Sequence, residues 1–184
     1  MDILSRIKTI ADETGFSESG YVAVSNLKFY DEIRRICEEN TCRNYATSWA
    51  CPPAVGTIDE CRARVSRFDR MLLISRAYKI EDSFDFEGMA EAGKDFKRLV
   101  DRFQKNIENV LSGYLLLSNE GCFRCAKCTY PDAPCRFENR LHHSIEGYGF
   151  IVSELAREAN IRYNNGLNTV TYFGAVLFNE EKKG

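Results

Sequence analysis

The sequence predicts an α/β fold: a small sheet of about four strands, with packed helices and two cysteine-rich loops at one side. Three observations lead to this prediction. Amphipathic helical stripes alternate along the chain with short β-branched and aromatic segments. Residues 71–117 follow a strand, long helix, strand pattern, which is typical of a βαβ unit. The eight cysteines fall into two groups between these elements.

The N-terminal part contributes two helices around one strand. Residues 1–14 carry apolar side chains along one helical face, and Gly15 is well placed to end that helix. Residues 20–25 are β-branched and aromatic enough for a short buried strand. A second amphipathic stripe predicts a helix over residues 30–39, and Cys37 lies at its end.

The middle of the chain supplies the βαβ unit. A capping-box pattern over residues 57–60 predicts a helix start, and residues 71–75 form the next strand. The longest helix begins beyond Ser83 and stops at Ser112-Gly113, and residues 114–117 then form a third strand. If these two strands are neighbours in one sheet, they are expected to be parallel and their connection right-handed.

The C-terminal part contributes one more helix and the last strand. Ser144 is expected to cap a helix over residues 151–159, and residues 169–178 form the final strand. His142 and His143 are the only histidines. A surface or capping role is favoured for both over a role as metal ligand or proton donor.

Composition sets the context for the cysteines. At 184 residues, 21.1 kDa and 44% hydrophobic residues, the chain can bury a real core, and we expect a single metal-cluster-binding domain over residues 1–184. The net charge of −2 and the sequence pI of about 5.8 give no basic footprint for nucleic acid. No apolar run approaches the ~18 residues of a membrane span. With no signal peptide visible, we expect a soluble protein of the reducing cytoplasm.

The C-terminal cysteine group comprises Cys122, Cys125, Cys128 and Cys135. Three thiolates at Cys-x-x-Cys-x-x-Cys spacing converge on one point, which is the arrangement that wraps a cubane iron–sulfur cluster. Structural zinc sites usually take two Cys pairs, or a Cys pair and a His pair, set well apart. All four are therefore predicted metal ligands, with iron–sulfur favoured and a zinc-stabilised interaction module kept as an alternative.

The N-terminal cysteine group comprises Cys37, Cys42, Cys51 and Cys61, and completes a second set of four. Two prolines directly after Cys51 stiffen the chain there, which suits a fixed ligand. Cys61, however, lies on the apolar face of its helix, and Cys37 ends a helical stripe, so either is open to a packing role. If one of them only packs, the second cluster has three protein ligands and one open iron.

Charged and aromatic side chains surround both groups. Arg124, Lys127 and Arg136 add positive charge, which favours the more negative reduced cluster, whereas aromatic rings that exclude water oppose it. Tyr45 and Trp49 are expected to form, with the double-proline turn, a shell over the N-terminal cysteine group. These five residues are the predicted cofactor-binding neighbours of the ligands.

Both cysteine segments resemble a known family. Three segments carry the resemblance: Cys37…Cys42-Arg-Asn-Tyr…Trp-Ala-Cys-Pro-Pro, Cys122…Thr-Tyr-Pro-x-x-Pro-Cys-Arg-Phe and Ser144-Ile-Glu-Gly-Tyr-Gly. They are similar to an uncharacterised family of predicted cysteine-rich metal-binding proteins, found mainly in anaerobic prokaryotes. The resemblance implies metal binding and, by analogy, a cluster-bearing protein. It implies no particular activity, and Cys61 is the cysteine that it matches least.

Three functions are consistent with these features. The preferred one is an iron–sulfur protein with two [4Fe-4S] clusters that transfers electrons to a redox partner protein. The first alternative is an iron–sulfur reductase or sulfur-chemistry enzyme that acts on a small-molecule substrate at an open iron, and the second is the zinc module. Because parallel crossovers bring equivalent strand ends to one edge, we expect the two cysteine groups to lie close together. Cys135 is also open to serving the other cluster, as in small two-cluster ferredoxins.

Overall fold

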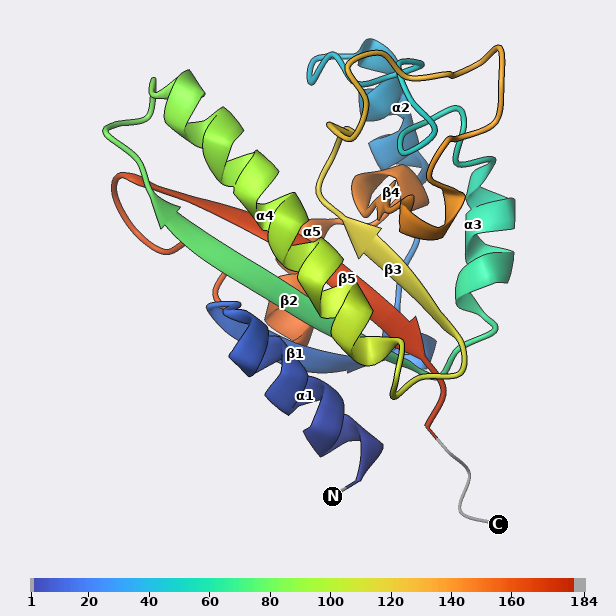
Figure 1. Cartoon of the computed structure of the whole chain (residues 1–184), viewed down its shortest axis with the longest axis vertical. Helices are drawn as coiled ribbons and strands as arrows, with labels where there is room; N and C mark the ends of the chain where they lie inside the picture. The colour runs from blue at the N-terminus through green and yellow to red at the C-terminus, as the bar shows by residue number, and fades with distance from the viewer. Residues whose placement is uncertain (1, 181–184) are drawn as a thin grey trace.

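The computed structural model of the chain describes residues 2–180. Within these residues one mixed sheet has the strand order β1-β2-β5-β3-β4 (Figure 1). The strands are Glu18–Ala23 (β1), Arg70–Lys79 (β2), Tyr114–Ser118 (β3), His143–Ser144 (β4) and Thr169–Phe178 (β5). The α/β class and the four predicted strands are confirmed, and β4 is a fifth strand of two residues that lies parallel to β3.

Helices form where the apolar stripes predict them. The α-helices are Ile3–Thr14 (α1), Asp31–Glu39 (α2), Ile58–Val65 (α3), Phe86–Ile107 (α4) and Val152–Glu158 (α5). Gly15 ends α1 in the left-handed conformation at φ 104°, and Thr57 and Glu60 cap α3 with a reciprocal capping box. No helix within residues 2–180 combines the length and the apolar character needed to cross a membrane.

The sheet is buried on both faces, which explains its continuous apolar strands. Along β2, Met71 and Leu73 pack into one core cluster while Leu72 and Ile74 pack into the other. Helices α1 and α4 cover the second of these faces, and α3 and α5 cover the first (Figure 1). This core leaves both cysteine loops outside the sheet, at one end of the molecule.

The pairing of the predicted βαβ unit differs from the expectation in one respect. β2 and β3 are not neighbours, because β5 lies between them and pairs antiparallel with both. β2 and β3 therefore still run in the same direction, and α4 crosses over β5 to join them. The predicted long helix also ends earlier, at Ile107, and a hydrogen-bonded turn from Leu111 N to Ile107 O at 2.8 Å follows it.

Ser144 does not cap a helix. It lies in β4, where its hydroxyl accepts the N–H of Gly147 at 3.2 Å and so supports a short 3-10 helix, Glu146–Tyr148 (η3). α5 starts eight residues later, at Val152, without a side-chain cap. The sequence pattern locates a helical turn near Ser144 but assigns the serine to the wrong helix.

The expected surface role of the two histidines is wrong. His142 is buried at 7% exposure, and its Nε2 lies 2.8 Å from Oε1 of Gln104 in α4. Nδ1 of His143 lies 3.0 Å from the hydroxyl of Tyr148, and burial lowers the pKa of His143 to about 4. Burial also lowers the pKa of His142, opposed by the carboxylate of Asp101. Both imidazoles are therefore neutral near pH 7 and hold the chain between β3 and η3.

Candidate metal centre

The two cysteine loops lie side by side at one end of the sheet (Figure 1). The backbone N–H of Gly121 donates to Sγ of Cys51 at 3.2 Å. The indole Nε1 of Trp49 donates to the carbonyl of Ala133 at 3.1 Å. These contacts join residues that are 70 and 84 positions apart in sequence, so the fold brings the two cysteine groups together.

The thiols of the C-terminal cysteine group line one small cavity of about 20 Å³. All four are free and half-buried. Two of the sulfurs accept backbone N–H groups, from Tyr130 to Cys128 at 3.5 Å and from Phe137 to Cys135 at 3.4 Å. Such N–H···S contacts stabilise a thiolate and help to set the potential of a bound cluster. The donor set and its supporting bonds therefore suit a metal thiolate site.

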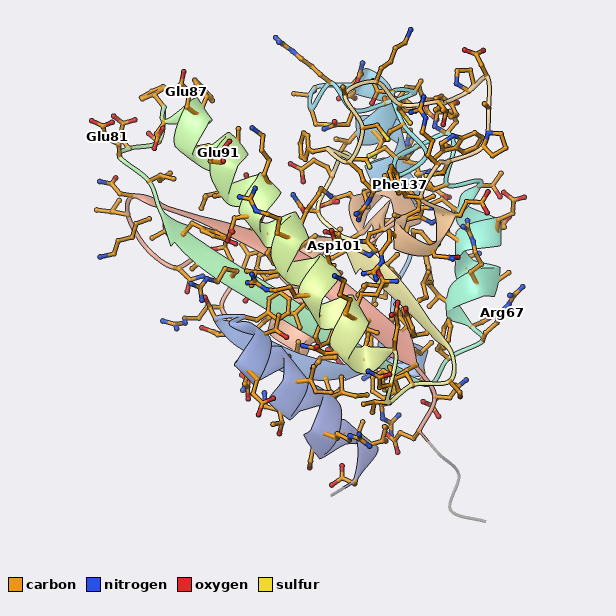
Figure 2. The ribbon with its side chains drawn as sticks, in the orientation of Figure 1. Arg67, Glu81, Glu87, Glu91, Asp101 and Phe137 are labelled. Atoms are coloured by element: carbon orange, nitrogen blue, oxygen red, sulfur yellow. The ribbon has the colours of Figure 1, made fainter. Side chains whose placement is uncertain are left out.

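Arg124 anchors this loop to α4. Its guanidinium forms a two-point ion pair with Asp101, at 3.1 and 2.6 Å, and donates to the carbonyl of Arg140 at 2.8 Å. Figure 2 shows Asp101 on α4, below Phe137 in the loop. Asp101 therefore neutralises the positive charge that the sequence predicts for Arg124. The ion pair fixes the position of the loop and adds little to its net charge. Lys127 and Arg136 are exposed, and Arg136 donates to the carbonyl of Lys127 at 3.0 Å.

Three thiols of the N-terminal cysteine group line a second, larger cavity. Cys37 at the end of α2, Cys42 in the following loop and Cys51 all face this cavity, which has a volume of about 570 Å³. Tyr45 also lines this cavity, beside the N-terminal cysteine group where the sequence analysis expected it. Burial raises the pKa of Cys37 to about 11 and also raises that of Cys51. Binding of a metal here would therefore displace protons from the thiols.

The backbone between Cys37 and Cys51 adopts an uncommon conformation. Asn40, Arg43 and Ala46 have positive φ values of 57°, 60° and 55°. Each non-glycine residue in this region costs about 1 kcal/mol or more, and such residues cluster at binding and active sites.

Cys61 is separated from the other three. It is fully buried in the apolar core, and its Sγ contacts the carbonyl of Val55 at 3.6 Å and Nη2 of Arg64 at 3.3 Å. It does not line the cavity that Cys37, Cys42 and Cys51 share. Of the two roles that the sequence leaves open for Cys61, the structure favours packing.

The side chain of Trp49 lies at the C-terminal cysteine group, whereas the sequence analysis predicted it at the N-terminal group. Its ring packs edge-on against Tyr130, with centroids 5.0 Å apart, and it lines the cavity of the C-terminal cysteine group. The expected shell over the N-terminal cysteine group therefore contains Tyr45 but not Trp49 among the residues that line its cavity. Trp49 is only two positions from Cys51 in sequence. This proximity fixes where its backbone lies but not where its side chain points.

Sequence reasoning missed three charged residues between the two groups. Lys97 of α4 is half-buried, and its ammonium donates to the carbonyl of Asn119 at 2.8 Å. Burial lowers the pKa of Lys97, whereas the thiol of Cys122 and the carboxylate of Glu120 raise it. Glu146 of η3 lines the larger cavity together with Glu120, and its Oε2 is buried with no hydrogen-bond partner. Burial, and then the charge of Glu120, raise the pKa of Glu146 to about 7.

A signal for Glu146 was present in the sequence. It is the one charged residue in the otherwise small and apolar run 144–152, where a solvated surface turn would not place it. Within residues 2–180, no three or more His, Cys, Asp or Glu side chains are already gathered around a single-ion position. The candidate centre is therefore defined by the thiols that share each cavity.

The fold and the site define a cysteine-rich α/β domain with two apposed thiol groups. The chain belongs to a family of predicted metal-binding proteins (DUF2284), whose profile matches residues 21–178. This match includes all eight cysteines and confirms the resemblance to an uncharacterised metal-binding family. No curated protein matches the chain.

One solved structure is similar to the chain as a whole. It is epoxyqueuosine reductase from Streptococcus thermophilus, at 13% sequence identity and a TM-score of 0.48. The alignment covers 100% of this chain and 47% of that one, so the chain spans about half the length of that protein.

Proposed function

We propose that this protein is an iron–sulfur protein that binds two [4Fe-4S] clusters and transfers electrons to a redox partner protein in the reducing cytoplasm. In this proposal Cys122, Cys125, Cys128 and Cys135 hold one cluster, and Cys37, Cys42 and Cys51 hold the other. The observation that carries it is the cavity shared by four free thiols, two of which already accept backbone N–H groups. A four-iron cluster is larger than this cavity, so its binding would spread the loop.

The position of the second thiol group supports the electron-transfer part of the proposal. Sγ of Cys51 is hydrogen-bonded to the residue that directly precedes Cys122. The cysteines that would hold the two clusters are therefore linked through one hydrogen bond and the peptide bond between Gly121 and Cys122. When bound, the clusters would supply the one-electron chemistry, and Gly121 would supply a short polar contact between their ligands.

Metal and acid-labile sulfide analysis of anaerobically purified protein tests the proposal. We expect about eight irons and about eight sulfides per chain, and Cys125→Ser should remove about half of each. Magnetic coupling between the two reduced clusters should broaden or split their resonance signals. One zinc ion per thiol group without sulfide would instead identify the zinc-stabilised interaction module, and would overturn the proposal.

The larger cavity favours a second candidate function, an iron–sulfur reductase or sulfur-chemistry enzyme. With Cys61 in the core, the N-terminal cysteine group offers three thiols, which leaves one iron of a four-iron cluster without a protein thiol. The cavity at this group is about 570 Å³, within the range of ligand-binding pockets. A small molecule that perturbs the resonance signal of only one cluster would favour this enzyme over a pure electron carrier.

A further inference from the structure

The larger cavity has an unusual balance of charge. Two carboxylates line it, those of Glu120 and Glu146. Among the residues that the structure describes, no Lys, Arg or His side chain lines it. The nearby Lys97 does not line it: its ammonium donates to the carbonyl of Asn119 and acts on Glu146 only through its charge. Thiolates at the three cysteines would add further negative charge.

Glu146 is held in a position that leaves one oxygen of its carboxylate without a partner. Its 3-10 helix η3 is fixed from both sides, because Arg34 of α2 donates to the carbonyl of Gly147 at 2.9 Å and Ile145 N donates to Ser118 O at 3.0 Å. Oε2 of Glu146 is nevertheless buried without a hydrogen-bond partner. A buried carboxylate oxygen without a partner is costly, and a hydrogen-bond donor or a cation would offset that cost.

Part of the cavity wall is aromatic. Tyr163 stacks on Phe173 with centroids 5.6 Å apart and an interplanar angle of 19°, and both residues line the cavity together with Phe150. Aromatic faces attract cations and stack on planar groups. This wall comes from β5 and from the segments around α5, whereas the thiols come from α2 and the loop after it.

We propose that this cavity binds a small organic cation with a planar or aromatic part, whose positive group pairs with Glu146 and Glu120 and whose planar part lies along the aromatic wall. Glu146 is the residue whose missing partner such a ligand would supply. This inference rests on the second candidate function, the iron–sulfur enzyme, because that function would make the bound cation its substrate. Binding itself depends only on the carboxylates and the aromatic wall.

Three probes of one shape and different charge test this proposal by anaerobic calorimetry on the metal-loaded protein. Benzamidine is a planar cation, benzamide is its neutral counterpart and benzoate is an anion. We expect benzamidine to bind at least about tenfold more tightly than benzamide, with benzoate the weakest, because a charge-assisted pair adds that much affinity. Equal binding of the three probes, or binding of none, would overturn the proposal.

Two variants locate the interaction. Glu146→Gln should weaken benzamidine binding about tenfold and leave benzamide almost unchanged, whereas Glu91→Gln on the exposed face of α4 serves as the matched control and should change neither. Tyr163→Ala, which keeps both carboxylates, should weaken benzamidine severalfold and so tests the wall even if the glutamate variant folds poorly. Circular dichroism checks the fold of each variant.

Metal and sulfide content, measured on the same samples, separates this inference from the proposed function. Full iron and sulfide without benzamidine selectivity would overturn the inference alone. Selective binding in protein that holds no iron or sulfide would overturn the proposed function alone. Loss of metal in Glu146→Gln would show that Glu146 is a metal ligand, and would overturn the inference in favour of that role.

Discussion

The backbone N–H of Gly121 donates to Sγ of Cys51 at 3.2 Å, and this contact joins the two cysteine groups of the chain. Gly121 has φ 75°, a conformation that favours glycine, and it directly precedes Cys122. A Cβ atom at this position would lie 2.8 Å from Oδ1 of Asn44 in the facing loop. Glycine at position 121 therefore suits both the left-handed backbone and the close approach of the two loops.

Gly121→Ala is accordingly expected to destabilise the protein and to separate the loops. Positive φ at alanine and the contact with Asn44 together should lower the free energy of unfolding by roughly 1–3 kcal/mol. Gly113→Ala is the matched control, since a Cβ there meets nothing within 4 Å. Urea denaturation measures both, and equal stability of the two variants would contradict the role assigned to Gly121.

Replacing Cys61 should separate packing from ligation. Because Cys61 is fully buried and does not line the cavity of the other three thiols, Cys61→Ala should keep the metal content of the wild type. The loss of the buried sulfur should lower the free energy of unfolding by roughly 1 kcal/mol. Cys51→Ala should lose metal from its group. Equal metal loss in both variants would place Cys61 among the ligands.

Local features of this fold were predictable, and long-range ones were not. The capping box at Thr57 and the end of α1 at Gly15 depend on neighbouring residues, so their patterns predicted them correctly. The insertion of β5 between β2 and β3 depends on a strand from the far end of the chain, which no local periodicity encodes. The spacing of the cysteines indicated both groups but not the direction of a side chain such as that of Trp49.

The same distinction explains the missed site residues. His142 is buried because Gln104, nearly forty positions earlier, supplies a hydrogen-bond partner at 2.8 Å. Lys97 looks like any polar residue of an amphipathic helix, and only the approach of the cysteine loops makes its environment distinctive. A charged residue gains its role here from the tertiary structure, so its sequence context carries little information.

The ion pair between Asp101 and Arg124 should stabilise the C-terminal cysteine group. Its side chains are 28% and 25% exposed, and Asp101→Ala would leave the guanidinium of Arg124 partly buried without its partner. We expect a loss of roughly 1–3 kcal/mol in the free energy of unfolding and faster metal loss to a chelator. Glu91→Ala, which breaks the exposed pair with Lys94 on the same helix (Figure 2), should cost less than about 0.5 kcal/mol. Similar effects of both changes would contradict an anchoring role.

The pH dependence of stability should reveal Glu146. Its pKa rises from 4.5 to about 7 on folding, so the folded protein holds this proton more tightly than the unfolded chain. The associated stability is present below pH 4.5 and is lost as the pH rises through 7. Glu146→Gln has no such loss and should be roughly 1–3 kcal/mol more stable than the wild type at pH 8, at equal metal content.

The comparison of Glu146→Gln with the wild type isolates this one group. His143 has a lowered pKa of about 4, so its contribution has the opposite sign and falls away as the pH drops from 6.5. Both proteins keep His143, and its contribution therefore cancels in the difference. A stability difference that is constant between pH 4.5 and 8 would contradict the raised pKa of Glu146.

Trp49 offers a fluorescence test of which group it covers. It is the only tryptophan in the chain, and it lines the cavity of the C-terminal cysteine group. An iron–sulfur cluster in that cavity would absorb the emission of Trp49, so we expect weak fluorescence in the loaded protein and strong fluorescence after metal removal. Cys125→Ser should be bright, and Cys51→Ala should stay dim while the C-terminal group keeps its cluster. The reverse pattern would return Trp49 to the N-terminal cysteine group, and a loaded protein as bright as the metal-free one would point to zinc, which does not absorb at these wavelengths.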